Sequence, residues 1–311
     1  MRVLVTGASG LVGTAVSRAL ARAGHAVIPL RRAINPSSGS GSGSEAAAVA
    51  SWDPSSGRIE LQPALPLDAV IHLAGESVAQ RWTPAARERI WRSRVDATLL
   101  LSRTLASLPQ SPRVLLSASA IGFYGDRGAE QVDETSASGS GFLAEVTRGW
   151  EESLAPAVEH GLRVVALRFG IILTPRGGAL AKLLTPFSLG VGGRVGDGRQ
   201  YWSWITLEDA VAAMLFALEA PGLSGPVNLV APGTVPNREL AAALGRVLHR
   251  PSFLPLPRFA VRVLLGEMGR EMLLGSARVH PERLLAAGFL FRHPQIEPAL
   301  RELLAGDATA A

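Results

Sequence analysis

The sequence predicts an α/β fold, a doubly wound parallel sheet joined to a smaller region that is mixed but mostly helical. The first observation is that short apolar runs of strand type alternate with amphipathic helical stretches over most of the chain. The second is a glycine-rich turn between the first such strand and the first helix. The third is size, because 311 residues with 47% hydrophobic content suffice for one large α/β body or two modest domains.

The predicted strands are continuous apolar runs, which is typical of strands buried on both faces of a parallel sheet. They are "RVLVT" (2–6), "HAVIPL" (25–30), "AAVASW" (47–52), "AVIHLAG" (69–75), "RVLLSAS" (113–119) and "RVVALRFGIIL" (163–173).

Helical segments separate these strands. Residues 11–24 place Val12, Val16 and Leu20 on one face, and a glycine ends the segment. A long helix is expected over residues 83–107, with Thr83 as its N-cap and a proline in its first turn. The Ser/Gly stretch 35–48 is too poor in apolar residues to pack, so we expect a solvated loop within the domain.

The pattern changes after residue 175. A glycine-rich segment (190–200), a helix (206–220) and a short strand (225–232) precede a tail that is mostly helical from Asn237. We therefore predict a Rossmann-like dinucleotide-binding domain over 1–175 and a substrate-side region with a helical C-terminal domain over 176–311. Part of 200–230 is expected to pack back on the sheet.

Composition argues against several other classes of protein. The chain has no cysteine, which excludes disulfides and thiolate metal sites. The six histidines are scattered without metal-ligand spacing, which argues against a zinc site. The absence of a G-x-S-x-G motif argues against a serine hydrolase of the α/β type. The net charge is only +5 and no aromatic-basic module accompanies it, which argues against nucleic-acid binding. No charged-then-apolar leader precedes the first strand, and no apolar run approaches the ~20 residues of a membrane span. We expect a cytoplasmic protein without a metal, nucleic-acid or membrane partner.

The glycines of "VLVTGASGLVG" have the spacing of a dinucleotide-binding turn. Gly7 can turn the chain out of the strand, Gly10 lets a diphosphate approach the backbone, and Gly13 lets the helix pack closely. The backbone of the turn and the first helical residues then presents N–H groups to phosphate, at Ser9, Leu11 and Val12. The alternative is a packing turn that binds no ligand.

The end of the second strand predicts which nucleotide is bound. An NAD site usually has an acidic residue there, whereas this chain has Arg31 and Arg32, and its next acidic residue is Glu45. Two guanidinium groups suit a 2′-phosphate, so NADP(H) is favoured over NAD(H). For Arg32 alone, a side chain that simply extends into solvent is an equal alternative.

Four segments resemble the extended short-chain dehydrogenase/reductase superfamily. They are "TGASGLVG", "VIHLAGE", "LLSASAIGFYGD" and "SWITLEDAV". More narrowly, "WDP", "HLAGE", "GGALAKLLTPF" and "LPLP" are similar to its atypical, epimerase-named branch, whose members end in a short helical domain. The resemblance implies a dinucleotide cofactor and, as substrate, a small polyol, sugar nucleotide or carbonyl compound. It also implies a possible homodimer through the helix that begins near Thr83.

The resemblance assigns further cofactor contacts to Leu73, Ala74 and Gly75, at the carboxyl end of a predicted strand. Glu76 would be solvated or bound to ribose. Asp53 would accept from the adenine amino group or, equally plausibly, cap a turn. In the predicted strand 113–119, Ser117 would lie near the cofactor, and Ser119 matches the family hydroxyl that hydrogen-bonds the substrate. The alternative for Ser119 is a serine that satisfies backbone groups.

The family's catalytic tyrosine and lysine, four residues apart, are absent. Their expected positions hold Phe142 and Val146, and no Tyr-x-x-x-Lys occurs anywhere in the chain. A tyrosine needs a nearby cation to lower its pKa from about 10 toward neutrality. Tyr124 is the candidate replacement at the site, although packing against its own loop is the more probable role.

Other replacements are weaker candidates. Glu145 could act as a base if desolvated, and Lys182, the single lysine, could meet a phosphate. Asp133 and Glu134 are expected to cap the following helix, and His72 to pack in the core. Two functions therefore stay open: an NADP(H)-dependent oxidoreductase or epimerase with a non-standard proton path, or a catalytically silent NADP(H) sensor or scaffold.

Overall fold

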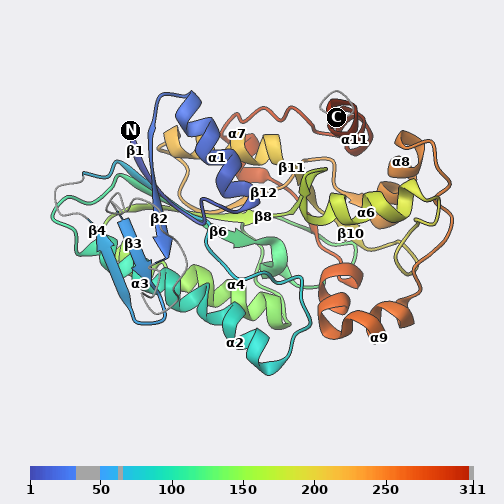
Figure 1. Cartoon of the computed structure of the whole chain (residues 1–311), viewed down its shortest axis with the longest axis horizontal. Helices are drawn as coiled ribbons and strands as arrows, with labels where there is room; N and C mark the ends of the chain where they lie inside the picture. The colour runs from blue at the N-terminus through green and yellow to red at the C-terminus, as the bar shows by residue number, and fades with distance from the viewer. Residues whose placement is uncertain (33–49, 62–65, 308–311) are drawn as a thin grey trace, which may run out of the picture.

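A computed structural model describes residues 1–32, 50–61 and 66–307 of the chain (Figure 1). The predicted loop 35–48 and the first residues of the predicted strand 47–52 lie outside these ranges.

An eight-stranded sheet forms the centre of the molecule, in the order β12-β8-β6-β5-β1-β2-β3-β4. Its strands are β1 (Arg2–Thr6), β2 (Ala26–Arg32), β3 (Ala50–Asp53), β4 (Arg58–Leu61), β5 (Ala69–His72), β6 (Val114–Ala120), β8 (Arg163–Phe169) and β12 (Gly225–Leu229). All neighbours are parallel except β3 and β4. The chain winds outward in both directions from β1, so the predicted doubly wound sheet is confirmed.

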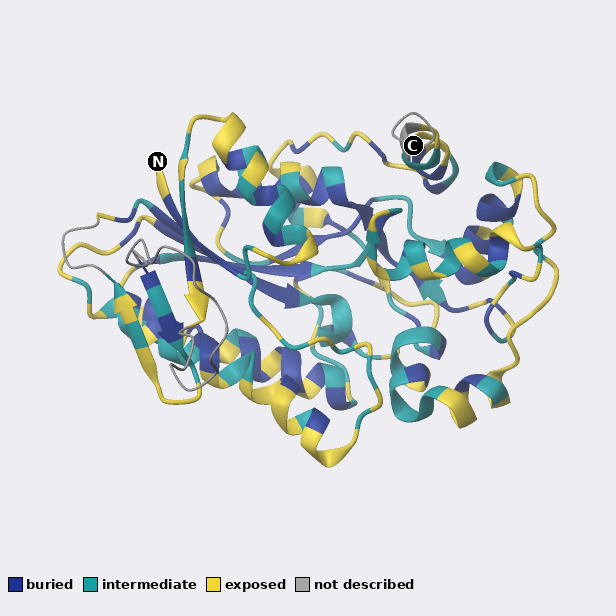
Figure 2. Cartoon of the chain, viewed as in Figure 1, coloured by how far each residue is buried: buried dark blue, intermediate teal, exposed yellow. Residues whose placement is uncertain are grey.

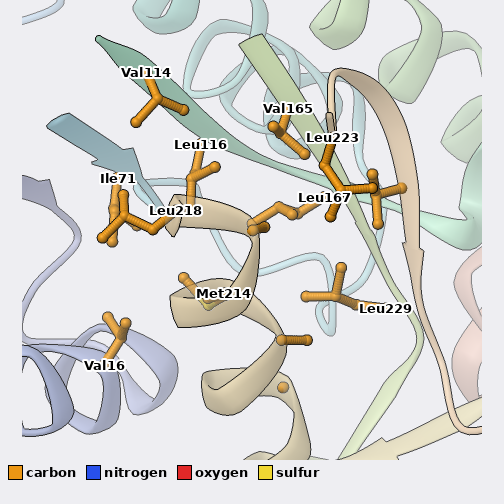
Figure 3. Close-up of a cluster of buried hydrophobic side chains, with 14 of the residues drawn as sticks. Val16, Ile71, Val114, Leu116, Val165, Leu167, Met214, Leu218, Leu223 and Leu229 are labelled. Atoms are coloured by element: carbon orange, nitrogen blue, oxygen red, sulfur yellow. The ribbon is translucent and has the colours of Figure 1, made fainter. Parts of the chain in front are cut away.

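Helices cover both faces of this sheet (Figure 1). On one face lie α1 (Leu11–Arg22) and α7 (Leu207–Glu219), and on the other α3 (Val95–Ala106), α4 (Phe142–Glu152) and α5 (Ala155–Glu159). Alternate residues of β1 belong to opposite faces: Val3 and Val5 pack in the cluster of α1 and α7, and Leu4 packs against α3. Figure 3 shows the first of these clusters, and Figure 2 shows that the central strands are the most deeply buried part.

The predicted helix over 83–107 is two helices. The first is α2 (Pro84–Arg92), whose N-cap Thr83 accepts a hydrogen bond from the Ala86 N–H at 3.2 Å, as predicted. The break falls at Ser93 and Arg94, and α3 then begins at Val95. The short strand β4, which no pattern predicted, pairs antiparallel with β3 at the sheet edge, and its residues are half-buried or exposed.

A second group of elements packs beside the carboxyl edge of the sheet. Apart from α10 (Glu282–Ala286), which packs on β12 of the central sheet, it includes β9 (Ile171–Thr174), α6 (Gly178–Ser188), β10 (Tyr201–Trp202), β11 (Trp204–Thr206), β13 (Val235–Pro236), α8 (Asn237–Val247), α9 (Arg258–Gly269), the π-helix η2 (Arg270–Leu274) and α11 (Ile296–Asp307). These elements have their own core, which contains Phe187, Trp204 and Leu244. Residues 207–229 nevertheless return to the sheet as α7 and β12.

Several contacts join the C-terminal segment to α4 and to the loop region before it. The strand β14 (Arg278–Val279) pairs with β7 (Gln131–Val132). In addition, the Glu271 carboxylate accepts from the backbone N–H groups of Phe142 and Leu143, each at 3.0 Å. The first turn of α4 is therefore capped by a residue distant in sequence, since Gly141 has no side chain to do so. No helix in the described ranges is long and apolar enough to cross a lipid bilayer.

We predict that Glu271→Ala lowers the free energy of unfolding by about 1–2 kcal/mol, the usual effect of removing a helix N-cap. Urea denaturation followed by circular dichroism would measure it. Glu88→Ala is the matched control, because Glu88 is exposed and pairs only with Arg92 on the same helix, where a loss below about 0.5 kcal/mol is expected. Equal stability of the Glu271→Ala variant and the wild type would contradict the capping role.

Candidate functional site

The glycine-rich turn after β1 has the geometry that phosphate binding requires. Gly7 has a φ of +66°, and a Cβ on Gly13 would lie 2.0 Å from the Gly7 carbonyl oxygen, so neither position tolerates a side chain. Gly10 is the N-cap of α1 and provides no side-chain acceptor. The first helical bond is from the Thr14 N–H to the Gly10 carbonyl, which leaves the N–H groups of the first turn, including Leu11 and Val12, without a helical acceptor.

The residues around this turn fit a diphosphate. Ser9 and Gly10 are exposed, so nothing in the described chain covers the amino end of α1. A helix terminus that is both uncapped and exposed is an anion-binding site, since its N–H groups and dipole favour negative charge.

The two predicted arginines lie beside this turn. Thr6, the last residue of β1, is in register with Leu30, so Arg31 and Arg32 continue beyond it at the carboxyl edge. Both are exposed. Because successive strand residues face opposite sides, only one of the two points to a given face of the sheet.

The end of β5 is built around Thr6 and His72. Thr6 Oγ1 accepts the backbone N–H groups of Leu73 and Ala74 at 3.0 and 3.1 Å, and it lies 2.7 Å from His72 Nδ1. Leu73 and Ala74 can thus contact a nucleotide through their carbonyl or side-chain atoms, but their N–H groups are already used. His72 is fully buried and also hydrogen-bonds Thr98, in agreement with the predicted core role.

Three other predicted cofactor residues have local partners. The Asp53 carboxylate accepts the Ser55 N–H at 3.0 Å and the Ser55 hydroxyl at 2.5 Å, which is the turn-capping alternative. These hydrogen bonds from Ser55 hold the Asp53 pKa below its usual range. Ser117 is fully buried, and the Glu76 carboxylate accepts from the Gln80 amide.

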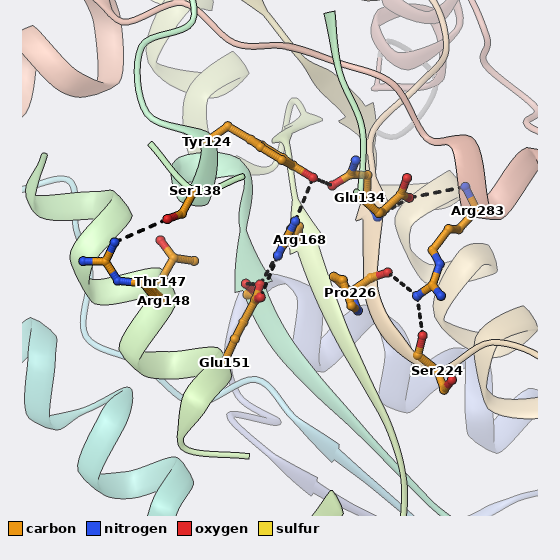
Figure 4. A network of polar contacts seen from close by, with 12 residues as sticks. Tyr124, Glu134, Ser138, Thr147, Arg148, Glu151, Arg168, Ser224, Pro226 and Arg283 are labelled. Carbon is orange, nitrogen blue, oxygen red and sulfur yellow. Dashed lines mark hydrogen bonds and ion pairs between the residues drawn. The ribbon is translucent and has the colours of Figure 1, made fainter. Parts of the chain in front are cut away.

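Ser119 belongs to a buried polar network at the ends of β6, β8 and β12. Figure 4 shows the network around Glu151, Arg168 and Tyr124. It is 3% exposed and donates its hydroxyl proton to Glu151 Oε1 at 2.6 Å. Arg168 binds both oxygens of that carboxylate, at 2.8 and 2.7 Å. Because the Ser119 proton points at Glu151, the Ser119 oxygen offers only lone pairs to any other group.

Tyr124 lies on the other side of Arg168. It is fully buried, accepts from Arg168 Nη1 at 2.9 Å and donates to Asn228 Oδ1 at 2.7 Å. Burial raises its pKa to about 12 despite the adjacent guanidinium, so the hydroxyl stays protonated at neutral pH. These contacts support a packing role and do not favour Tyr124 as the group that replaces the family's tyrosinate.

The α4 face that meets the end of β6 begins at Leu143, one residue later than the position expected from the family resemblance. Phe142 and Val146 instead pack beneath α2, where the Phe142 ring lies 4.9 Å from that of Trp82. A Cβ on Gly122, in the turn after β6, would lie 3.1 Å from Leu143 Cβ and 3.5 Å from Thr147 Oγ1. The α4 face toward Ser119 therefore consists of Leu143, Thr147 and Glu151. Neither this face nor the pair Phe142 and Val146 contains a tyrosine or a lysine.

The remaining candidates lie elsewhere. Glu145 and Lys182 are exposed. Asp133 caps its own turn by accepting from Thr135, and Glu134 accepts from the N–H groups of Asn228 and Arg283, so neither caps α4 as predicted. That cap comes from Glu271. Burial raises the Glu134 pKa above its ordinary value.

Sequence reasoning missed Glu151, Arg168 and Asn228. One signal was available, since Arg168 is a charge in the middle of the apolar run "RVVALRFGIIL", and such a charge is almost always paired when buried. Two surface hollows, of about 430 and 460 Å³, lie away from this edge, near Leu223 and near His249. Within the described ranges, no three His, Asp or Glu side chains form a metal-binding group.

The winding of the sheet and the uncapped, glycine-lined start of α1 define a doubly wound α/β protein of the dinucleotide-binding class. The model of the NAD dependent epimerase/dehydratase family matches residues 3–229, and that of a domain of unknown function matches residues 256–303. The chain belongs to the NAD dependent epimerase/dehydratase family, and the resemblance read from its motifs is confirmed.

Similar proteins support this assignment along the whole chain. The epimerase family protein Mb2239 of Mycobacterium bovis is 41% identical over 299 residues, covering 96% of each chain. The crystal structure of the human epimerase family protein SDR39U1 with NADPH has a TM-score of 0.85 and 31% identity, covering 98% of this chain and 99% of that one. A nucleoside-diphosphate sugar epimerase from Corynebacterium glutamicum is 35% identical with a TM-score of 0.74, covering 99% of this chain and 60% of that one.

We predict that burial of His72 makes stability fall in mild acid. Burial lowers the His72 pKa from 6.5 to about 4, so the unfolded chain binds a proton at a pH where the folded protein does not. The contribution of His72 to the free energy of unfolding is fully present above pH 6.5 and is lost as pH falls toward 4. The loss amounts to up to about 3 kcal/mol at 1.36 kcal/mol per pKa unit. Urea denaturation at several pH values would measure this loss.

His72→Gln should remove that component of the pH dependence, whereas the control His160→Gln, at an exposed position, should retain it. The raised pKa of Glu134 acts in the opposite direction in all three proteins and cancels in the difference. Parallel curves for the wild type and His72→Gln would disprove the assignment.

Proposed function

We propose that this protein binds NADP(H) and acts as an oxidoreductase or epimerase of the extended short-chain dehydrogenase/reductase type. The observation that carries the proposal is the exposed, uncapped start of α1 beside Arg31 and Arg32. The human relative, solved with NADPH, supports the choice of nucleotide. Residues 176–311 would form the substrate side. The helices from Thr83 onward would pair in a homodimer. The absence of cysteine favours the cytoplasm.

The proposed substrate is a small molecule with a reactive hydroxyl or carbonyl group, such as a polyol or sugar nucleotide. We base this choice of substrate on Ser119, because it lies near the carboxyl end of β6 and its hydroxyl is hydrogen-bonded to Glu151. Its oxygen can accept a hydrogen bond from a substrate hydroxyl but has no free proton for a carbonyl while it donates to Glu151. We therefore expect the site to bind the alcohol form of the substrate before hydride transfer.

The protein groups would hold the substrate proton while the cofactor, when bound, supplies hydride transfer. Arg168 keeps the Glu151 carboxylate in place, and Glu151 in turn orients the Ser119 hydroxyl. A hydroxyl held by Ser119 could pass its proton to that oxygen as the Ser119 proton moves to Glu151. This path replaces a tyrosinate with a serine and a carboxylate.

A catalytically silent NADP(H) sensor or scaffold is the second candidate. The observation that favours it is the α4 face toward Ser119, where Leu143 and Thr147 provide no group that ionises near neutral pH. Such a protein would bind the nucleotide with the same residues but transfer no hydride.

We predict that replacing Arg31 and Arg32 together by alanine weakens NADPH binding about tenfold or more and leaves NADH binding within about twofold. The reason is that charge-assisted hydrogen bonds to a 2′-phosphate would be lost. Isothermal titration calorimetry would measure both affinities. The control is the double replacement of Arg18 and Arg22, which are exposed on α1. Equal losses for the two nucleotides would remove the preference for NADP(H).

We predict that Ser119→Ala lowers the rate of deuterium transfer from labelled NADPH to a carbonyl library about 100-fold, with NADPH affinity unchanged, because this reaction is the reverse of the alcohol reaction and uses the same proton path from Glu151 through Ser119 to the substrate oxygen. Ser107→Ala, at an exposed position after α3, is the control. Wild-type protein that binds NADPH tightly but transfers no deuterium to any compound would favour the sensor. Transfer that persists in Ser119→Ala would rule out Ser119 as the substrate-binding hydroxyl.

A further inference from the structure

Arg94 lies at the carboxyl end of β5, in the break between α2 and α3. Its guanidinium packs against Gly75, because a Cβ on that glycine would be 3.4 Å from both Arg94 Cζ and Nη2. On its other side, Arg94 Cζ lies 5.0 Å from the centre of the Trp150 ring of α4. Arg94 therefore fills the space between the end of β5 and the helix that carries Glu151.

The Arg94 guanidinium makes only weak polar contacts with the surrounding protein. Its recorded hydrogen bonds, from Nη1 to the Ile90 carbonyl and to Ser93 Oγ, are both 3.4 Å long. Among the described residues no carboxylate lies within 4 Å of it, and the neighbouring Glu76 instead lies 3.7 Å from Arg89. Burial lowers the Arg94 pKa to about 10 while the charge of Glu76 acts in the opposite direction, so the guanidinium stays charged at neutral pH without a carboxylate in direct contact.

On the side toward β5, the residue that covers Arg94 is Gly75. Gly75 is exposed and has no side chain, so only its backbone covers the guanidinium. An anionic or hydroxyl-rich ligand at this edge of the sheet could therefore approach Arg94 across the glycine backbone.

The path of the proposed cofactor leads over this position. Its diphosphate would lie at the end of β1, its reactive ring must approach Ser119 at the end of β6, and β5 lies between these two strands. With strands about 4.8 Å apart, that distance is roughly 10 Å, which the nicotinamide half of a dinucleotide can cover. The ribose and phosphate of that half would then lie over Gly75.

We propose that Arg94 binds the nicotinamide-side ribose and phosphate of NADP(H) and supplies the positive charge that a lysine on α4 would otherwise provide. The inference rests on the proposed function. Arg94 approaches from the helix break before α3, whereas the missing lysine would belong to α4. The charge would therefore come to the same edge of the sheet from a different element.

The test compares two ligands by isothermal titration calorimetry on the full chain. NADPH contains both halves of the dinucleotide, whereas adenosine 2′,5′-bisphosphate lacks the nicotinamide half. Arg94→Met should weaken NADPH binding about tenfold or more and leave the bisphosphate within about twofold. Arg94→Lys should recover part of the loss, and the control Arg92→Met, at an exposed position on α2, should change neither affinity.

The outcomes separate this inference from the proposed function. A wild-type protein that binds neither ligand overturns both. If the wild type binds both ligands, then an unchanged NADPH affinity in Arg94→Met, or equal losses for the two ligands, overturns only the role of Arg94. The absence of recovery in Arg94→Lys also overturns it, since the charge would then be irrelevant. Should Arg94→Met fail to fold by circular dichroism, Arg94→Gln replaces it, because glutamine can still donate to Ile90 and Ser93 without the charge.

Discussion

The buried ion pair between Arg168 and Glu151 is the interaction on which the arrangement of the candidate site depends. Their side chains are 4% and 16% exposed, and two hydrogen bonds hold them together. Removing one partner of such a pair usually costs about 3–5 kcal/mol, because the other charge stays buried alone. Through this pair, β8 is tied to α4, and the same two residues hold Ser119 and Tyr124. The ion pair therefore fixes the end of α4 against β8 and against the Ser119 hydroxyl.

This dependence explains how the site can differ from its family and still be ordered. The family resemblance implied a tyrosine and a lysine on α4 as the catalytic pair. Here that helix presents Leu143 and Thr147 to the strand end, and its polar contact is made one turn later by Glu151. Substituting the two usual catalytic positions does not disturb the packing, because the helix is positioned by Glu151 at its end and by Glu271 at its start. In this fold, the residues that position α4 are thus different from the residues at the usual catalytic positions.

The sheet, its winding and the turn at Gly7 follow from local patterns, and they were predicted correctly from the sequence. The periodicity of apolar residues and the φ freedom of glycine act over a few residues, so a single sequence contains them. The polar network could not be predicted in the same way. Glu151 and Arg168 are 17 residues apart, and Asn228 meets Tyr124 across 104 residues. Which of many charged residues meet inside depends on how helices pack on strands, and no short-range pattern encodes that. The one-residue error in the α4 face has the same cause, since the spacing of motifs gives positions along the chain but not the direction in which a helix is turned.

The cap of α4 by Glu271 has a consequence for the order in which the protein is assembled in the cell. The ribosome makes α4 more than a hundred residues before the carboxylate that satisfies its first N–H groups, and β12, the outer strand of the sheet, is also made late. Until then, the nascent chain holds an unfinished helix start and an unpaired β8 edge, the kind of edge that other chains can join. Elongation rate and chaperone contact over this interval should therefore determine how much of the protein reaches its native form.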